Sequence, residues 1–201
     1  MLYGYFGIVG SGKTLGAVIQ AYQAFRQGRT VYSTMPLNFE HVPVRDVEDF
    51  VPCREGFLLA DELWIVADSR LSMSARNKLL SLILLRSRKL DLDIAYTEQH
   101  YTQVDVRVRA NTHFFVSSQV FPMFSSLRDA RAYREAGGEF TLDQTVWDGD
   151  GELVCRRRIS HVEQFFNLYD TSADPYIYDM RGTARSLKEA VAEAEDVYEP
   201  E

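Results

Sequence analysis

The chain has 201 residues, of which 46% are hydrophobic and 25% charged, a composition that fits a soluble globular domain and excludes collagen, coiled coil and global disorder. Its net charge of −7 excludes a uniformly basic nucleic-acid-binding protein, so any contact with DNA must come from a local basic patch. No apolar run approaches the roughly 20 residues that span a bilayer, and the sequence therefore predicts no transmembrane segment.

Strand-like apolar runs alternate with helical patterns along the first part of the chain. We expect, in chain order, a strand at 2–8, a helix at 13–26, strands at 30–34 and 57–60, a helix at 74–88, and strands at 92–97 and 113–118. Pro36 and Pro43 bracket a predicted loop. The alternation is typical of βαβ units and predicts an α/β fold, a mostly parallel sheet flanked by helices.

The pattern changes after Ser118. The alternating segments 139–147 and 152–160 flank Asp148-Gly149-Asp150-Gly151, which predicts a C-terminal β-hairpin with an Asp-Gly turn. A terminal helix is expected at 186–197, running into an acidic tail. We therefore interpret residues 1–135 as the core and residues 136–201 as a hairpin, helix and tail that complete the same domain.

A phosphate-binding motif follows the first predicted strand. Residues 7–14, GIVGSGKT, satisfy GxxxxGK[ST] between a strand and a helix, which is the context that the Walker A motif requires. Lys13 is expected to reach the β and γ oxygens of ATP, and Thr14 to bind Mg²⁺. The predicted nucleotide-binding residues are Gly7, Gly10, Ser11, Gly12, Lys13, Thr14 and Leu15. With the sheet, this motif predicts a RecA-like P-loop NTPase core.

Two carboxylates follow the apolar strand at 57–60, as in a Walker B motif. Asp61 would hold a water bound to Mg²⁺, and Glu62 would act as general base toward the attacking water. Alone, Asp61-Glu62 would be better explained as a strand that ends in a solvated acidic helix cap. With a complete Walker A motif, the pair favours an ATP hydrolase. A P-loop kinase, with residues 128–134 as an arginine-rich lid, is the alternative from another class.

Further polar candidates lie near the predicted strand at 92–97. Gln99 follows that strand and could orient the attacking water or sense the γ-phosphate, although a glutamine at this place can also be an ordinary loop residue. An arginine is also expected to stabilise charge in the transition state. The candidates are Arg86, Arg88, Arg107 and Arg109, and cations at helix ends also have a purely structural explanation.

Three segments resemble a known family. The runs 88–99 (RKLDLDIAYTEQ), 103–112 (QVDVRVRANT) and 165–171 (FFNLYDT) are similar to those of Zot-like (zonular-occludens-toxin-like) P-loop ATPases and of viral genome-packaging ATPases in the FtsK/HerA superfamily. The resemblance implies that Gln99 is a sensor and that Arg88 reaches into a neighbouring subunit. Lys89 stands where the family often has histidine, which leaves the choice between Arg86 and Arg88 open.

The resemblance implies an ATP-hydrolysing motor that translocates double-stranded DNA and packages a viral genome, with Lys13, Glu62, Arg88 and Gln99 as catalytic residues. A Zot-like ATPase for virion assembly or secretion is the alternative. The implied partners are double-stranded DNA and further copies in a homo-oligomeric ring, of which a hexamer is one form. The local charges suggest that a basic patch at Arg70, Arg76 and Lys78 holds the DNA backbone, although these residues could equally form a solvated helix face. Capsid or membrane proteins of a virion are further candidates. The expected location is the cytoplasm of the host cell or the virion.

Overall fold

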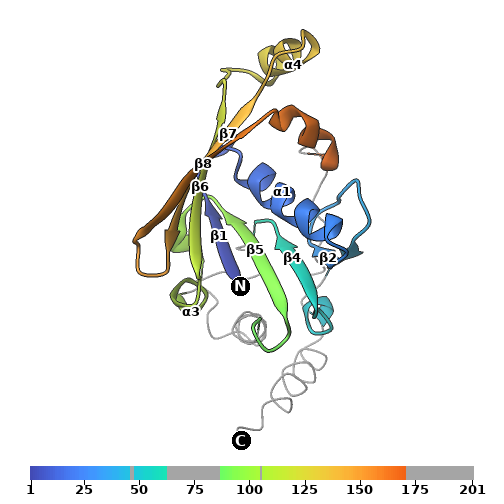
Figure 1. Cartoon of the computed structure of the whole chain (residues 1–201), viewed down its shortest axis with the longest axis vertical. Helices are drawn as coiled ribbons and strands as arrows, with labels where there is room; N and C mark the ends of the chain where they lie inside the picture. Colours follow the sequence, from blue (N-terminus) through green and yellow to red (C-terminus); the bar gives the residue numbers. More distant parts are fainter. Residues whose placement is uncertain (46–47, 63–86, 105, 171–201) are drawn as a thin grey trace, which may run out of the picture.

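The computed structural model describes residues 1–45, 48–62, 87–104 and 106–170, and a single eight-stranded sheet runs through them (Figure 1). Its order is β3-β2-β4-β5-β1-β6-β7-β8. The strands are β1 (Leu2–Phe6), β2 (Thr30–Ser33), β3 (Val42–Pro43), β4 (Gly56–Ala60), β5 (Leu92–Glu98), β6 (Phe114–Phe121), β7 (Thr141–Asp148) and β8 (Leu153–Ser160). The first six run parallel, and β7 and β8 add to β6 antiparallel. The predicted α/β class is confirmed.

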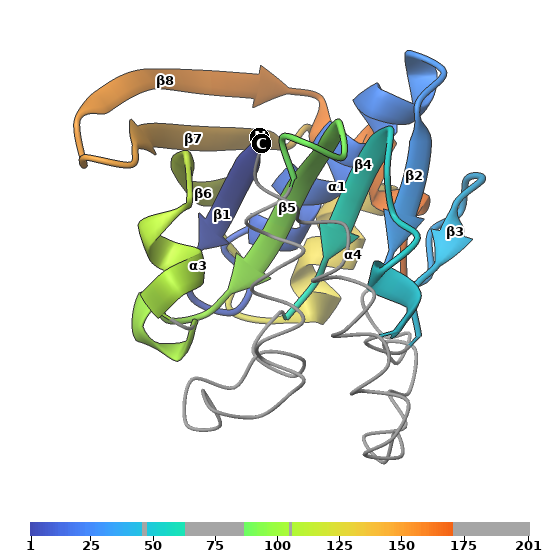
Figure 2. The same cartoon turned by 90° about the horizontal axis from the view of Figure 1, so that it is seen from below.

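The helices lie on and around this sheet. They are α1 (Lys13–Arg26), α3 (Val106–Ala110) and α4 (Leu127–Glu135), with 3-10 helices η1 (Glu48–Phe50), η4 (Tyr101–Gln103) and η5 (Val162–Leu168). In Figure 2, β1, β5, β4 and β2 stand side by side in front of α1. None of the helices in the described part of the chain is long and apolar enough to cross a membrane.

The core has one layer on each face of the sheet. Alternate residues of β4 divide between them: Phe57 and Leu59 pack toward α1, whereas Leu58 and Ala60 pack toward η1 and α3. All five residues of β4 are buried, as expected for a parallel strand covered on both faces. Because β1, β5 and β4 run parallel, their carboxyl ends lie at the same edge of the sheet. The site described below is at this edge.

The ribbon of β6 and β7 extends past this edge and carries α4. β1 pairs with β6 only as far as Ser117, whereas β6 continues to Phe121, which lies opposite Thr141 of β7. Figure 1 shows α4 at the far tip of this ribbon, beyond the start of α1. We call β6, α4 and β7 the arm.

Several elements differ from the sequence expectation. β3 lies inside the predicted loop, and α3, α4 and η5 were not predicted. Residues 87–90 form a turn rather than the end of a helix. The rest of the predicted helix 74–88, and the predicted terminal helix 186–197, lie outside the described residues.

Candidate nucleotide-binding and catalytic site

The glycine-rich loop joins the carboxyl end of β1 to the start of α1. Gly12 has φ 91° and caps α1, which begins at Lys13. A Cβ on Gly12 would lie 2.5 Å from Cγ2 of Val120 on β6, so both the left-handed backbone and the close approach of β6 require glycine. A hydrogen bond from Val120 N–H to Ser11 C=O (3.1 Å) also fixes the loop to the arm.

The predicted nucleotide-binding residues all lie in this loop or in the first turn of α1. Gly7, Gly10 and Ser11 belong to the loop, and Thr14 and Leu15 to the helix. The side chain of Leu15 packs in the core, so only its backbone N–H can face a ligand. The first N–H groups of a helix have no partner within it and attract phosphate. The loop is therefore able to hold the phosphates of a nucleotide.

Asp61 leaves the end of β4 among three threonine hydroxyls. Its Oδ1 accepts hydrogen bonds from Oγ1 of Thr14 (3.0 Å) and of Thr97 (2.7 Å). Its backbone N–H donates to Oγ1 of Thr34 (2.9 Å). Burial raises the pKa of the Asp61 carboxyl, and the bonds from Thr97 and Thr14 act against that shift. The carboxyl is thus held in one orientation beside the phosphate-binding loop.

Lys13 and Glu62 form the second pair of the site. Lys13 is almost fully buried, and its Nζ lies 3.9 Å from Oε1 of Glu62. Glu62 has a left-handed backbone (φ 50°), which is rare for a residue with a side chain. Its N–H donates to Oγ1 of Thr97 (2.9 Å). The structure therefore brings together both carboxylates and both Walker A side chains predicted from the sequence.

The side chains around Asp61 fit a Mg²⁺ ion bound together with a nucleotide. Thr14 Oγ1 and Asp61 Oδ1 are hard oxygen donors 3.0 Å apart, next to the phosphate-binding loop. Mg²⁺ in phosphate sites takes one or two protein ligands and completes its shell with waters and phosphate oxygens. Thr14 can offer a lone pair to the ion while its hydroxyl proton stays directed at Asp61.

Gln99 lies at the same edge of the sheet as Asp61. Ala60, the last residue of β4, is in register with Tyr96 of β5. β5 continues two residues further, to Glu98, and Gln99 follows it directly as a half-buried residue. Its role as a sensor stays a prediction. That role requires Gln99 to lie at the same edge of the sheet as the Walker motifs, and it does.

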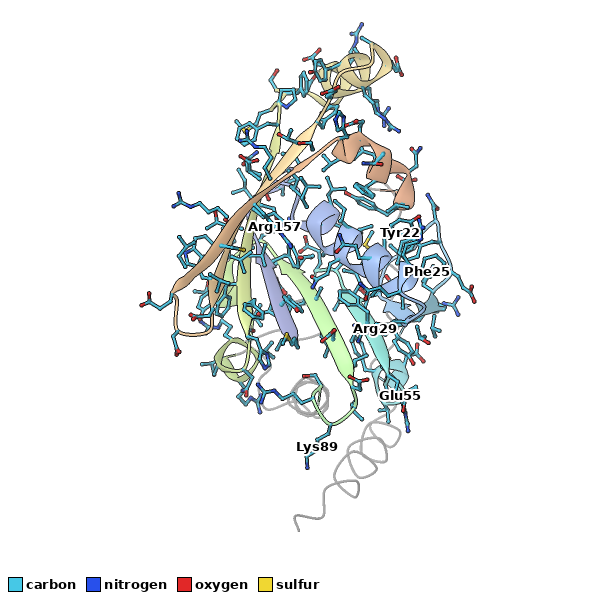
Figure 3. The ribbon with its side chains drawn as sticks, in the orientation of Figure 1. Tyr22, Phe25, Arg29, Glu55, Lys89 and Arg157 are labelled. Carbon is cyan, nitrogen blue, oxygen red and sulfur yellow. The ribbon has the colours of Figure 1, made fainter. Side chains whose placement is uncertain are left out.

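Arg88 lies at the opposite edge of the sheet. It is exposed, in the turn that enters β5, where Leu92 N–H donates to Ser87 C=O (2.9 Å). Figure 3 shows the adjacent Lys89 at this end of the molecule, far from the start of α1. β5 has seven residues, a length of about 23 Å at 3.3 Å per residue. Arg88 therefore cannot reach the phosphate-binding loop of its own chain.

The other arginine candidates differ in their surroundings. Arg109 lies 4.6 Å from the centre of the Tyr101 ring and donates to Val104 C=O (3.0 Å). Arg107 is exposed on α3. Arg86 lies outside the described residues, as do the three residues of the predicted basic patch: Arg70, Arg76 and Lys78.

Sequence reasoning gave no individual role to three further residues: Thr34, Thr97 and Tyr169. Thr34 follows β2 and Thr97 lies near the end of β5, the strands on either side of β4, and only polarity at strand ends could have indicated them. Tyr169, in the YDT run, forms a bridge with Leu37 and is buried. Burial raises the pKa of the Tyr169 phenol, and the charge of Asp61 raises it further.

Comparison with known proteins agrees with this geometry at the level of fold. No protein-family model and no curated protein matches the chain. Among solved structures, the N-terminal domain of zonular occludens toxin from Neisseria meningitidis is similar over 84% of this chain and 98% of its own, with 17% identity and a TM-score of 0.54. The chain has the RecA-like P-loop NTPase fold.

Two further structures are similar but more distant. The genome packaging NTPase B204 from Sulfolobus turreted icosahedral virus 2, solved with ATP-gammaS, matches over 80% of this chain and 95% of its own, with 11% identity and a TM-score of 0.47. Flagellar accessory protein FlaH from Methanocaldococcus jannaschii matches over 78% and 83%, with 10% identity and a TM-score of 0.49. The likeness to the zonular occludens toxin domain, rather than these two, confirms at the level of fold the resemblance to Zot-like proteins that the sequence motifs indicate.

Proposed function

We propose that this P-loop NTPase is a Mg²⁺-dependent ATPase. The observation that carries the proposal is the meeting of the two Walker motifs. Thr14 and Asp61, 47 positions apart in sequence, share a 3.0 Å hydrogen bond, and Lys13 faces Glu62 across 3.9 Å. A metal-binding pair, a phosphate-binding cation and a general base converge at one point, as water-mediated hydrolysis of a phosphoanhydride requires.

Each side chain has a distinct task in this proposal. The loop N–H groups and Lys13 bind the β and γ phosphates. Thr14 and Asp61 would hold Mg²⁺, which would neutralise part of the phosphate charge. A γ-phosphate that engages Lys13 replaces Glu62 as partner of the ammonium, so that the Glu62 carboxylate is released to accept a proton from water. Gln99, at the end of β5, orients that water.

We further propose that hydrolysis drives movement of double-stranded DNA by a homo-oligomeric ring, and that the cargo is a viral genome being packaged. The support is the family resemblance of the runs around Arg88, Gln99 and Tyr169, together with the six basic residues and no acidic ones between positions 69 and 90. The proposed location is the host cytoplasm or the virion, where capsid or membrane proteins would meet the ring.

A Zot-like role in virion assembly or secretion is the second candidate. The likeness to the N-terminal domain of zonular occludens toxin, with a TM-score of 0.54, favours it. The kinase alternative is less well supported, because its suggested lid is α4. Arg134 on α4 donates to Asn167 Oδ1 (2.8 Å) and packs over the Phe166 ring of η5, whereas a lid must move to close.

One assay separates the three candidates. Phosphate release from ATP is measured with Mg²⁺ alone, with long double-stranded DNA, and with a mixture of nucleosides and nucleotides as phosphate acceptors. A packaging motor releases phosphate faster with DNA, an assembly ATPase releases it at a rate that DNA does not change, and a kinase consumes ATP without phosphate release when an acceptor is present. No phosphate release under any of the three conditions would contradict the ATPase proposal.

A further inference from the structure

One buried hydroxyl contacts both Walker B acids. Thr97 on β5 is fully buried. Its Oγ1 donates to Asp61 Oδ1 (2.7 Å) and accepts from the backbone N–H of Glu62 (2.9 Å). A hydroxyl has a single proton, and an ionised carboxylate can only accept, so the direction of both bonds is fixed. Thr97 is the donor to Asp61 and the acceptor for Glu62.

The two bonds act on different parts of the acid pair. The bond to Asp61 sets the orientation of a carboxyl that also accepts from Thr14, while Thr34 accepts from the backbone N–H of Asp61. The bond from Glu62 anchors a backbone amide at φ 50°. A non-glycine residue persists in this conformation only when its surroundings impose it. The Thr97 hydroxyl is one of the contacts that impose it, and it thereby sets the direction in which the Glu62 side chain leaves β4.

Thr97 also joins the two strands that carry the catalytic groups. It belongs to β5, two residues before Gln99, whereas Asp61 and Glu62 follow β4. We propose that Thr97 is a positioning residue for ATP hydrolysis, whose hydroxyl holds Glu62 and Asp61 in their working geometry and ties them to the end of β5. This inference rests on the proposed ATPase function. Thr97 touches neither nucleotide nor water in this scheme and acts only through the two acids.

The test compares kcat and ATP affinity in four proteins: wild type, Thr97→Val, Thr97→Ser and Thr112→Val. Valine keeps the shape of threonine and removes the hydroxyl, and serine keeps the hydroxyl. Thr112 is the matched control, because it is also a buried threonine whose hydroxyl is hydrogen-bonded, to Tyr96 OH (2.7 Å) and Val108 C=O (3.0 Å), but it lies away from the Walker motifs.

We expect Thr97→Val to lower kcat by roughly 10- to 100-fold, the usual effect of removing a group that orients a functional residue. Affinity for ATP should change by less than about threefold, because the phosphate-binding loop is intact. Thr97→Ser should recover most of the rate. Thr112→Val should keep the wild-type kcat even where thermal unfolding shows lower stability. This pattern cannot come from a general loss of packing.

A wild-type kcat in Thr97→Val overturns the inference, as does a serine variant no faster than the valine variant or an equal loss in Thr112→Val. Should the valine variant not fold, Thr97→Cys replaces it. Its thiol is a weak donor and acceptor, so an intermediate kcat is expected and a wild-type kcat is contradictory. A wild-type protein that releases no phosphate contradicts the proposed function itself, whereas an active wild type with an unaffected valine variant contradicts only the role of Thr97.

Discussion

At the scale of single residues, Gly12 occupies a position that only glycine fits, for two reasons. Its φ is 91°, and an added Cβ would lie 2.5 Å from Val120 and 2.9 Å from Leu142. We expect Gly12→Ala to lower stability by roughly 2 to 4 kcal/mol, from backbone strain and overpacking together, and to weaken ATP binding at least tenfold because the loop must shift.

Gly28→Ala is the matched control for this prediction. Gly28 also has a positive φ of 78°, but nothing lies within 4 Å of its Cβ position. Its alanine variant should lose roughly 1 kcal/mol from the backbone alone and keep the wild-type affinity. Titration calorimetry and urea unfolding measure both quantities. Equal ATP affinities in the two variants would argue against a P-loop role for Gly12.

The sequence could predict most of the site but not its supports. The spacing of Gly7, Gly12 and Lys13 defines a motif, and an apolar strand that ends in Asp61-Glu62 defines another. Thr34 and Thr97 belong to no spacing pattern, since their function depends on which strands become neighbours in the sheet. Chain order alone does not specify that β4 lies between β2 and β5.

At the scale of elements, the turn that enters β5 decides how an arginine could take part in catalysis. Because Arg88 lies at the edge of the sheet away from the loop, we expect it to act only on the nucleotide of another subunit. Arg88→Ala should bind ATP normally and hydrolyse it slowly. Mixing it with Lys13→Ala should restore part of the activity, because some interfaces then combine an intact loop with an intact arginine.

The control for Arg88 is Lys89→Ala, an exposed cation in the same turn. This variant should hydrolyse ATP at the wild-type rate by itself, without being mixed with another variant. Phosphate release across a titration of the two inactive proteins, with the assembly mass checked in parallel, gives the answer. Mixtures that assemble but stay inactive would exclude Arg88, and Arg86 or Arg109 would be tested next.

The amino ends of β2, β4 and β5 are joined by an ion-pair cluster around Asp93. Arg29 contacts Asp93 Oδ2 (2.6 Å) and Gly56 C=O (2.6 Å), and the N-terminal ammonium contacts Oδ1. Figure 3 shows Arg29 at this end of the sheet. Burial acts to raise the pKa of Asp93, but hydrogen bonds from the ammonium and Arg29 outweigh it and hold the pKa below its ordinary value.

A carboxyl whose pKa is lowered by folding stabilises the protein above the ordinary value, about 3.9, and loses that effect as the pH falls through the folded-state value. We expect Asp93→Asn to lower the free energy of unfolding by roughly 1 kcal/mol or less at pH 7, since the pair is partly exposed. The difference should shrink below about pH 3.9. Urea unfolding over pH, with Asp150→Asn in the exposed hairpin turn as control, measures it; a difference independent of pH would contradict the assignment.

Element prediction succeeded where burial imposes a pattern. β4 and α1 are identified by an apolar run and an apolar face. α4 was missed as a helix because its residues are largely exposed and charged, and it is held by ring contacts of Tyr133 with Phe124 and Phe140 instead. β3 was missed because two residues, one of them proline, carry no periodicity.

At the scale of the whole molecule, the mostly parallel sheet follows from the βα alternation, and the antiparallel end follows from the hairpin. The strand order and the extension of the arm past the P-loop cannot be derived from these sequence patterns. They depend on contacts between distant segments, such as those of Val120 with Ser11 and Gly12. The net charge of −7 also concerns the whole molecule, since it requires a local patch for any binding of DNA.

That patch is predicted at Arg70, Arg76 and Lys78. Replacing all three with glutamine should weaken binding to double-stranded DNA regardless of sequence. Each phosphate contact that is lost lowers the slope of log affinity against log salt by about 0.9, hence by between about 2 and 3 for the triple variant. Fluorescence anisotropy at several salt concentrations measures the slope. An unchanged slope would mean that DNA, if bound, follows another path.

Asp61 and Glu62 meet the Walker A side chains at one point, where we propose that ATP is hydrolysed. The most direct measurement takes ATP affinity and phosphate release with Mg²⁺ from the same preparations of wild type, Glu62→Gln and Lys13→Ala. We predict that Glu62→Gln binds ATP as the wild type does but releases phosphate at least 100-fold more slowly, whereas Lys13→Ala loses binding. Undiminished phosphate release by Glu62→Gln would contradict the account.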